Sequence, residues 1–252
     1  MKVCIITGAS SGLGEKLLCH ATKLINADEY WIISRSEKKL CEIADGYAEC
    51  KVCPVALDLT DKDAINTLKE KLDNENAEVV ALINNAGFGK LGKVWEISHQ
   101  DQQNMIALNC ASLTALSALC INYMKQGAFV LNIGSIAAFS PNARLNCYSA
   151  TKSFVFAFTQ GLRFELKGTG INACVACPGP METAFLSNAN IEKGSSHTFD
   201  TLPYCNPDKV AKNAIKAAKK GHAVYTPTFF YKFYRVLAKL LPVRLMMHFS
   251  KV

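Results

Sequence analysis

The chain has 252 residues, of which 50% are hydrophobic and 19% charged, so it can bury a sizeable core and is not intrinsically disordered. Its net charge of +7 is concentrated near the end of the chain. From Asn206 onward ten Lys or Arg accompany one acid, Asp208, whereas the preceding residues carry 18 basic and 20 acidic side chains. This distribution argues against a nucleic-acid-binding surface over the whole protein.

Short apolar runs rich in β-forming residues alternate with longer stretches of helical spacing. The runs predict strands over 2–7, 30–34, 50–57, 79–84, 128–133 and 171–177, with a seventh, edge strand at 223–226. The intervening stretches predict helices over roughly 12–26, 36–48, 61–74, 101–126, 148–168 and 207–220. Buried strands separated by helices form a parallel sheet, so we predict a doubly wound α/β fold.

Two later segments lack this regularity. Residues about 184–206 are rich in Ser, Asn and Gly and predict a loop that covers a substrate as a lid. The tail, about 228–252, mixes basic and apolar residues at helical spacing and is interrupted by Pro242. It could serve as a second lid, a subunit contact or a helix on an anionic membrane surface, and an amphipathic cover with a solvated basic face is favoured.

The eleven cysteines include two C-x-x-C spacings, at Cys50–Cys53 and Cys174–Cys177. The second pair lies in a strand-like run, where residues three apart point to opposite faces and cannot hold one metal ion. With an odd number of cysteines and no apparent signal peptide, we expect reduced, buried thiols, no metal site and a cytoplasmic protein. No apolar run reaches the roughly 18 residues that span a bilayer, so no transmembrane segment is expected.

Polar and turn-forming residues follow each predicted strand, where parallel sheets bind their ligands. In "TGASSGLG", Gly8, Gly12 and Gly14 lie between a strand and a helix, so backbone amides can approach a pyrophosphate closely. Further along the chain come "NNAG" (84–87), "GS" (134–135), "YSATK" (148–152) and "PG" (178–179). Taken singly, each of these short motifs also occurs in loops and helices that have no binding or catalytic role.

In this order and at these spacings, the five motifs resemble those of the short-chain dehydrogenase/reductase family, over about residues 2–183. The resemblance implies one Rossmann-type domain over 1–252 with about seven parallel strands, and a carbonyl reductase-like enzyme that transfers a hydride between a nicotinamide cofactor and an alcohol or carbonyl carbon. It implies catalytic roles for Asn109, Ser135, Tyr148 and Lys152. It implies cofactor contacts from Gly8, Ser10, Ser11, Gly12, Leu13, Ser34, Arg35, Asp58, Leu59, Asn85, Ala86, Gly87, Tyr148, Lys152, Pro178, Gly179, Met181 and Thr183.

Tyr148 and Lys152 are four residues apart, so they share one face of a helix. A nearby ammonium favours the phenolate, and we therefore expect Lys152 to lower the pKa of Tyr148. In the family, the matching tyrosine exchanges a proton with the substrate oxygen, Ser135 matches the hydroxyl that hydrogen-bonds this oxygen, and Asn109 matches a residue that distorts its helix and holds a relay water. The spacing of four residues between Tyr148 and Lys152 is also common on the surfaces of helices that have no catalytic role.

The end of the second strand predicts the choice of cofactor. NAD enzymes usually place a carboxylate there to bind the ribose hydroxyls, but this chain has Ser34 followed by Arg35. A guanidinium suits a 2′-phosphate, so NADP(H) is favoured over NAD(H).

The expected substrate is a small apolar ketone, aldehyde or secondary alcohol, with a steroid-like molecule among the candidates. An apolar substrate pocket is predicted from Phe88, Trp95, Phe139, Leu145, Phe185 and Leu186. Three alternatives are a non-catalytic dinucleotide sensor, a membrane-surface lipid or steroid reductase, and a sugar-nucleotide epimerase or dehydratase. The last usually has G-x-x-G-x-x-G and a longer substrate domain. A homodimer or homotetramer through 101–126 and 148–168 is expected.

Overall fold

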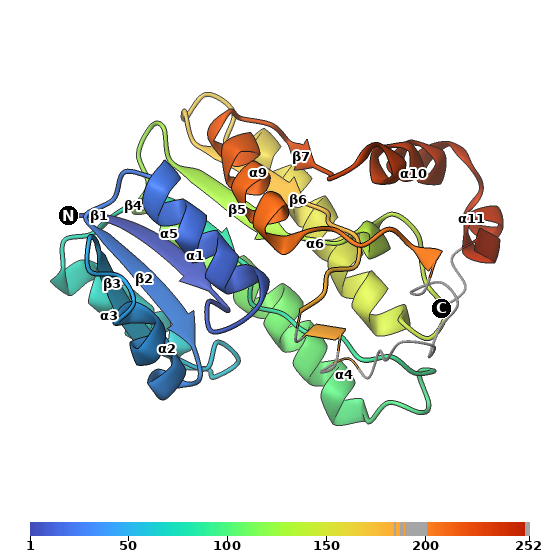
Figure 1. The fold of residues 1–252 in the computed structure, drawn as a ribbon, viewed down its shortest axis with the longest axis horizontal. Helices are drawn as coiled ribbons and strands as arrows, with labels where there is room; N and C mark the ends of the chain where they lie inside the picture. Colours follow the sequence, from blue (N-terminus) through green and yellow to red (C-terminus); the bar gives the residue numbers. More distant parts are fainter. Residues whose placement is uncertain (184, 187–188, 190–200, 250–252) are drawn as a thin grey trace.

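The computed structural model describes residues 1–183, 185–186, 189 and 201–249, and it contains a seven-stranded parallel sheet (Figure 1). The strand order is β3-β2-β1-β4-β5-β6-β7, which confirms the predicted doubly wound fold. The strands are β1 (Lys2–Thr7), β2 (Glu29–Ser34), β3 (Lys51–Ala56), β4 (Glu78–Asn84), β5 (Phe129–Ile133), β6 (Asn172–Ala176) and β7 (Val224–Tyr225).

The composition of each strand matches its position in the sheet. Every residue of β5 is buried, as is every residue of β1 after the first, because both lie inside the sheet with helices on each face. The edge strand β3 is half exposed and contains Pro54, which pairs in register with Ile32. Proline cannot donate to a neighbouring strand, so it is tolerated at an edge.

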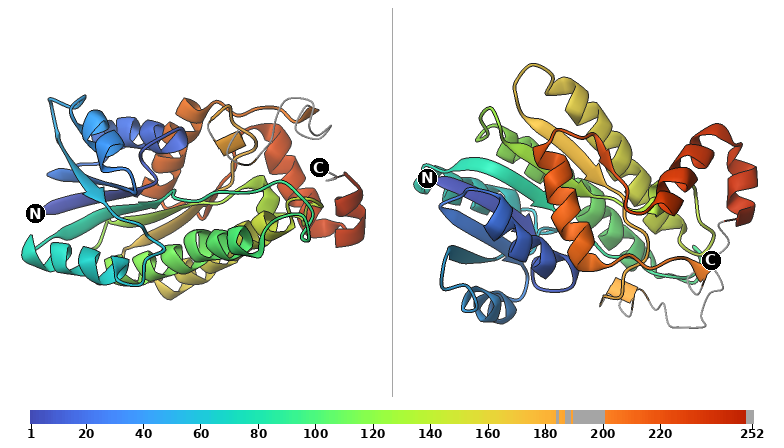
Figure 2. Two further views of the ribbon diagram at one scale, coloured as in Figure 1. Left: turned by 90° about the horizontal axis from the view of Figure 1, so that it is seen from below. Right: turned by 45° about the horizontal axis from the view of Figure 1, so that its top comes forward.

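The helices form two layers, one on each face of the sheet (Figure 2). On one face lie α1 (Leu13–Leu24), α2 (Glu37–Ala44) and α9 (Pro207–Lys219), whose buried side chains share a core with β1 and β5. On the other face lie α3 (Ala64–Asn74), α5 (Leu113–Ile121) and α6 (Asn146–Glu165). A short 3₁₀ helix, η2 (Ile136–Ala138), follows β5 and was not predicted.

The predicted helix 101–126 is one helical stretch with an irregular middle. It consists of α4 (His99–Ile106), the π-helical segment η1 (Ala107–Ser112) and α5. By length and composition, residues 99–121 would be apolar enough to cross a membrane, with a mean hydropathy of 1.6. The expectation that no such run exists was therefore wrong. Leu116 and Cys120 pack against the sheet, so part of the apolar character of this stretch serves the core.

The end of the chain forms two helices, α10 (Phe229–Leu240) and α11 (Val243–Phe249), with Pro242 between them as predicted. In Figures 1 and 2 both helices lie at one end of the molecule, beyond the sheet. Of the lid expected at 184–206, residues 184, 187–188 and 190–200 lie outside the described residues.

All eleven cysteines are free thiols. Burial raises the pKa of Cys120, Cys174 and Cys177 to about 12, so these thiols stay protonated at neutral pH. Among the described residues, no three His, Cys, Asp or Glu side chains gather as metal ligands.

Candidate active site

A cavity of about 1100 Å³ opens at the carboxyl ends of the strands. It lies over the junction of β1 and β4, where the strand order reverses, and this is the position at which doubly wound sheets bind ligands. We call the part lined by the turns after β1, β2 and β3 the glycine end. The part lined by Ser135, Tyr148, Phe185 and α10 is called the tyrosine end.

At the glycine end, the turn between β1 and α1 requires residues without a side chain. Gly8 and Gly12 have φ angles of +65° and +56°, which side chains disfavour. A Cβ at Gly8 would lie 2.8 Å from the Ala86 Cα, and one at Gly14 would lie 2.0 Å from the Gly8 carbonyl oxygen. The turn thereby brings the first amides of α1 to the cavity wall, where they suit a phosphate group.

The "NNAG" segment joins the ends of β1 and β4. The Thr7 hydroxyl accepts hydrogen bonds from the backbone amides of Asn85 and Ala86, each at 3.0 Å. The Asn85 side chain donates to the carbonyl oxygens of Thr7 and Gly8, both also at 3.0 Å. These four bonds fix the backbone on both sides of the crossover, so this wall of the cavity is preorganised.

Beneath this wall, buried amides link the strands to the helices. Asn84 donates to Asn132 at 2.9 Å and to Ser117 at 3.2 Å, while Asn132 donates to Thr159 at 2.9 Å. This network ties the centre of the sheet to α5 and α6. These bonds hold the side chains in one arrangement, although the Asn84 side-chain oxygen has no hydrogen-bond partner among the described residues.

The end of β2 carries groups suited to an anion. The Ser34 hydroxyl is buried at the cavity and has no hydrogen-bond partner among the described residues. Arg35 and Lys39 line the same corner and are exposed. Hydrogen bonds from Thr60 lower the pKa of Asp58, and the charge of Arg35 lowers it further. An orphaned hydroxyl beside two cations fits a phosphorylated ribose.

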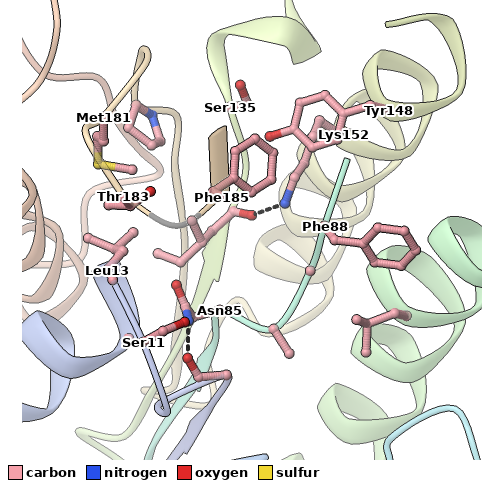
Figure 3. Close-up of a pocket in the computed structure, with 18 of the residues that line it drawn as sticks. Ser11, Leu13, Asn85, Phe88, Ser135, Tyr148, Lys152, Met181, Thr183 and Phe185 are labelled. Carbon is pink, nitrogen blue, oxygen red and sulfur yellow. Dashed lines mark hydrogen bonds between the residues drawn. The ribbon is translucent and has the colours of Figure 1, made fainter. Parts of the chain in front are cut away.

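At the tyrosine end, three predicted side chains converge (Figure 3). Tyr148 and Lys152 come from adjacent turns of α6, and the Lys152 ammonium lies 5.7 Å from the centre of the Tyr148 ring. Lys152 donates a hydrogen bond of 2.8 Å to the carbonyl oxygen of Ile133 at the end of β5. Ser135 caps η2 by accepting from the Ala137 amide at 3.1 Å, which fixes its hydroxyl beside the phenol.

The pKa of Tyr148 differs from the expectation. Burial raises it to about 12, and only the hydrogen bond with Ser135 opposes that rise. Burial also lowers the pKa of Lys152 to about 8, because a desolvated ammonium is disfavoured. The prediction that Lys152 lowers the pKa of Tyr148 was therefore wrong for this structure. Burial therefore pushes each of the two groups toward its neutral form.

Asn109 lies outside the cavity lining and is almost fully buried. It occupies the middle of η1, so the predicted distortion of this helix is present as a π-helical turn. Its amide nitrogen donates to Phe88 O at 2.9 Å and to Thr151 Oγ1 at 3.0 Å, and its oxygen accepts from the Phe88 amide at 3.1 Å. Asn109 thus clamps the segment after β4 against α6.

The predicted apolar pocket is partly correct. Phe88, Leu145, Phe185 and Leu186 line the cavity, and the ring centre of Phe185 lies 5.5 Å from that of Tyr148. Trp95 does not line it, because this side chain is 80% exposed and packs against Lys93. Phe139 is also displaced from it, since its ring packs edge-on against Phe156. Both corrections have one cause, since proximity in sequence did not determine which way the rings point.

Every other predicted contact lines this cavity. The predicted cofactor residues found there are Gly8, Ser10, Ser11, Gly12, Leu13, Ser34, Arg35, Asp58, Leu59, Asn85, Ala86, Gly87, Tyr148, Lys152, Pro178, Gly179, Met181 and Thr183. Sequence reasoning missed several lining residues, among them Lys39, Lys90, Asn142, Phe230, Tyr231 and Tyr234. The last three belong to α10, and the only signal for them was the apolar pattern of the tail.

Residues 2–194 match the short chain dehydrogenase family. The chain therefore belongs to this family, whose members are oxidoreductases that bind a nicotinamide dinucleotide. The NADP-dependent 3-hydroxy acid dehydrogenase of Schizosaccharomyces pombe is 35% identical over 191 residues, which is 73% of this chain and 73% of that protein.

Solved structures share the fold. A short-chain dehydrogenase from Sphingobium yanoikuyae in complex with NADPH superposes with a TM-score of 0.79 at 25% identity, covering 91% of this chain and 89% of that chain. The 3-ketoacyl-(acyl-carrier-protein) reductase from Brucella melitensis complexed with NADH has a TM-score of 0.78 at 23% identity, covering 90% and 96%. The second likeness concerns the fold alone.

Proposed function

We propose that the protein is an NADP(H)-dependent reductase of a ketone or aldehyde, which also runs in reverse on the corresponding secondary alcohol. One observation carries the proposal: Ser135, Tyr148 and Lys152 converge at one end of a cavity whose other end is the glycine turn after β1. A surface helix that merely happened to place tyrosine four residues before lysine would not bury both side chains in such a cavity.

In the proposed reduction, Ser135 and Tyr148 hold the carbonyl oxygen of the substrate between their hydroxyl groups. Tyr148 remains protonated at neutral pH because burial keeps its pKa at about 12, so it is ready to act as the acid. NADPH, when bound, supplies a hydride to the carbonyl carbon. The Tyr148 hydroxyl gives its proton to the oxygen, the C=O bond becomes a C–OH bond, and Ser135 stabilises the negative charge that develops there.

Lys152 has two proposed tasks. Its ammonium would hydrogen-bond the ribose of the cofactor, and it would help to return a proton to Tyr148 from solvent. Its bond to Ile133 O orients the side chain along the cavity wall. Asn109 acts as a positioning residue, because it fixes the Phe88 backbone and Thr151 beside the Tyr148–Lys152 helix.

We propose NADP(H) as the preferred cofactor because of the corner formed by Ser34, Arg35 and Lys39. A 2′-phosphate would meet the exposed cations of Arg35 and Lys39, whereas a bare ribose offers them no negative charge. The NADP dependence of the fission-yeast relative supports the same choice.

The remaining expectations are also proposals. We propose one catalytic domain over 1–252, a cytoplasmic location consistent with its free thiols, and a homodimer or homotetramer. The exposed Phe154 and Phe164 on α6 and the exposed Ile106 on α4 support a subunit contact along these helices.

The test is a panel of apolar ketones and aldehydes assayed by NADPH oxidation with the wild-type protein and a Tyr148→Phe variant. The proposal predicts turnover by the wild type and its near-complete loss in the variant. A non-catalytic sensor would bind NADPH, measured by quenching of protein fluorescence, without turnover of any compound. Undiminished activity of the variant would contradict the role of Tyr148.

A further inference from the structure

The outward face of α10 is apolar. Successive residues of a helix are about 100° apart, so Phe229, Phe233, Val236 and Leu240 fall within one narrow sector. Their exposed fractions are 83%, 54%, 50% and 74%. The predicted basic face is therefore not the whole of the solvent-exposed side of this helix, because an apolar row is exposed as well. Exposed side chains of this size in one row mark an interaction surface.

The opposite face of α10 is held firmly by the body of the protein. Tyr231 is completely buried and donates a hydrogen bond of 2.6 Å to the carbonyl oxygen of Pro203. Its ring packs so closely on Gly179 that a Cβ there would lie 2.3 Å away. Because Tyr231 anchors one side of α10 in the protein, the opposite side, with the apolar row, faces outward.

Positive charges lie beside the exposed row. Lys232 and Lys239 are exposed and fall next to Val236 on the helix surface, and Arg244 is exposed on α11. Residues 229–249 contain no Asp or Glu. The next helix continues the pattern, since Val243, Leu245 and Met247 of α11 are exposed as well.

A second apolar element lies at the same end of the molecule. The loop after β4 carries Val94 and Trp95, and both side chains are exposed. In Figures 1 and 2 this loop and the two C-terminal helices extend beyond the same end of the sheet. Aromatic side chains with a polar group, such as tryptophan, favour the boundary between lipid and water.

From these observations we propose that the exposed row of α10, with α11, docks on the surface of an anionic phospholipid bilayer. Phenylalanine, valine and leucine would enter the boundary of the acyl chains, while the lysines beside them would reach the phosphate groups. A second copy of this chain is a poorer partner. A twofold contact through this face would bring the lysines and Arg244 of both copies together with no acid from α10 or α11 between them.

Docking would also bring the tyrosine end of the cavity close to the membrane surface. Phe230, Tyr231 and Tyr234 of the same helix line the tyrosine end, so one side of α10 touches the cavity while the other side touches lipid. On the basis of the proposed function, the substrate would then be a lipophilic carbonyl compound that partitions into membranes. This second step depends on the reductase activity, whereas the docking itself does not.

The experiment is flotation of the full-length protein with vesicles at low salt, using 70% phosphatidylcholine with 30% phosphatidylglycerol, or phosphatidylcholine alone. We expect the protein to float with the anionic vesicles and to stay at the bottom with the neutral ones. A variant with Phe233→Ser, Val236→Ser and Leu240→Ser should lose at least tenfold in bound fraction. Lys232→Ser and Lys239→Ser should each weaken binding about fivefold. The matched control is Phe164→Ser, an equally apolar and 78% exposed position on α6, which should float like the wild type. Because Phe164 also belongs to the proposed subunit contact, the size of this variant is compared with the wild type by light scattering.

Three outcomes would overturn the docking proposal. The first is failure of the wild type to float with anionic vesicles. The second is undiminished flotation of the triple variant, which would place the lipid-binding surface elsewhere. The third is a smaller oligomer of the triple variant by light scattering with no flotation of either protein, which would make this face a contact between copies. Circular dichroism and NADPH binding of each variant report folding, and none of these readouts needs turnover, so the proposed function can fail separately.

Discussion

At the glycine end of the cavity, backbone turns directly after β1, β2 and β3 present their groups, whereas at the tyrosine end side chains come from helices far apart in the chain. Gly8 lines the first because it directly follows β1, and Ser34 because it ends β2. Tyr148 and Tyr231 line the second only because α6 and α10 pack around it. The cofactor half of this site is therefore formed by residues close in sequence, whereas the substrate half is formed by tertiary packing. Five variants or conditions test this difference.

The largest effect is expected at the tyrosine end, for Tyr148→Phe. Removing the phenol oxygen deletes the proposed acid and should lower kcat by about 10²- to 10⁴-fold. NADPH affinity, measured by fluorescence titration, should stay within about twofold, because loss of one hydroxyl leaves the glycine end intact. Tyr234→Phe is the matched control, since this tyrosine also lines the cavity, and it should retain most of the activity. Equal loss in both variants would contradict the assignment.

At the glycine end, Arg35→Ala should raise the Kd for NADPH by about 10- to 100-fold, as expected for losing a charged hydrogen bond of about 1.5–3 kcal/mol. The Kd for NADH should hardly change, so the ratio of the two constants is the measurement. Lys38→Ala, a neighbouring exposed lysine that does not line the cavity, provides the control. An unchanged ratio would remove the argument for NADP(H).

The pH dependence of binding connects the two ends. Burial lowers the pKa of Lys152 to about 8 in the free protein, so the ammonium is lost as pH rises through that value. A cofactor that needs the ammonium must then bind together with a proton, and the Kd for NADPH should rise about tenfold per pH unit above pH 8. Lys152→Met should abolish this slope. A slope that persists in the variant would assign the titration to another group.

The role of glycine in the turn can be tested by stability. Gly12 has a φ of +56° and a ψ of −121°, which side chains disfavour, and it faces Thr183, so Gly12→Ala should cost about 1–3 kcal/mol of unfolding free energy. A denaturant titration of the two proteins, compared by midpoint, gives this value. No loss of stability would show that the turn does not need its positive φ.

The smallest effect has the opposite sign. Gly161 lies within α6 and has nothing within 4 Å of the position of a Cβ, so Gly161→Ala should stabilise the protein by about 0.5–1 kcal/mol. The same titration measures it. A loss of stability would reveal a contact of this face of α6, such as the proposed subunit contact.

Most strands were predictable to within one or two residues, because each is a short apolar run between turn-forming residues. The observed β1 covers 2–7 as predicted, and β2 begins one residue early at Glu29. Glu29 is buried at the start of its strand because its carboxylate accepts from Trp31 at 2.8 Å and pairs with Lys51. Hydrophobic periodicity does not predict that a charged residue belongs to a buried strand, because its partners on the same and the neighbouring strand are known only from the structure.

The pKa values of the site could not be predicted from residue types. The spacing of Tyr148 and Lys152 indicates proximity, but their protonation depends on how completely the surrounding helices exclude water. Here burial raises the pKa of one and lowers that of the other. The same limit applies to Trp95 and Phe139, whose apolar side chains suit a pocket equally well in sequence.

By itself, the sequence determined the alternation of strands and helices, the glycine turn, the residues at each strand end and the shared face of Tyr148 and Lys152. These features depend on backbone geometry within a few residues, which composition and spacing specify. Only the tertiary structure decided that α10 closes the tyrosine end with Tyr231 and turns Phe229 and Leu240 outward. A helix with apolar residues on most of its surface is oriented by the face that packs against the rest of the protein. Here Tyr231 packs on Gly179, which lies about 50 residues away in the chain.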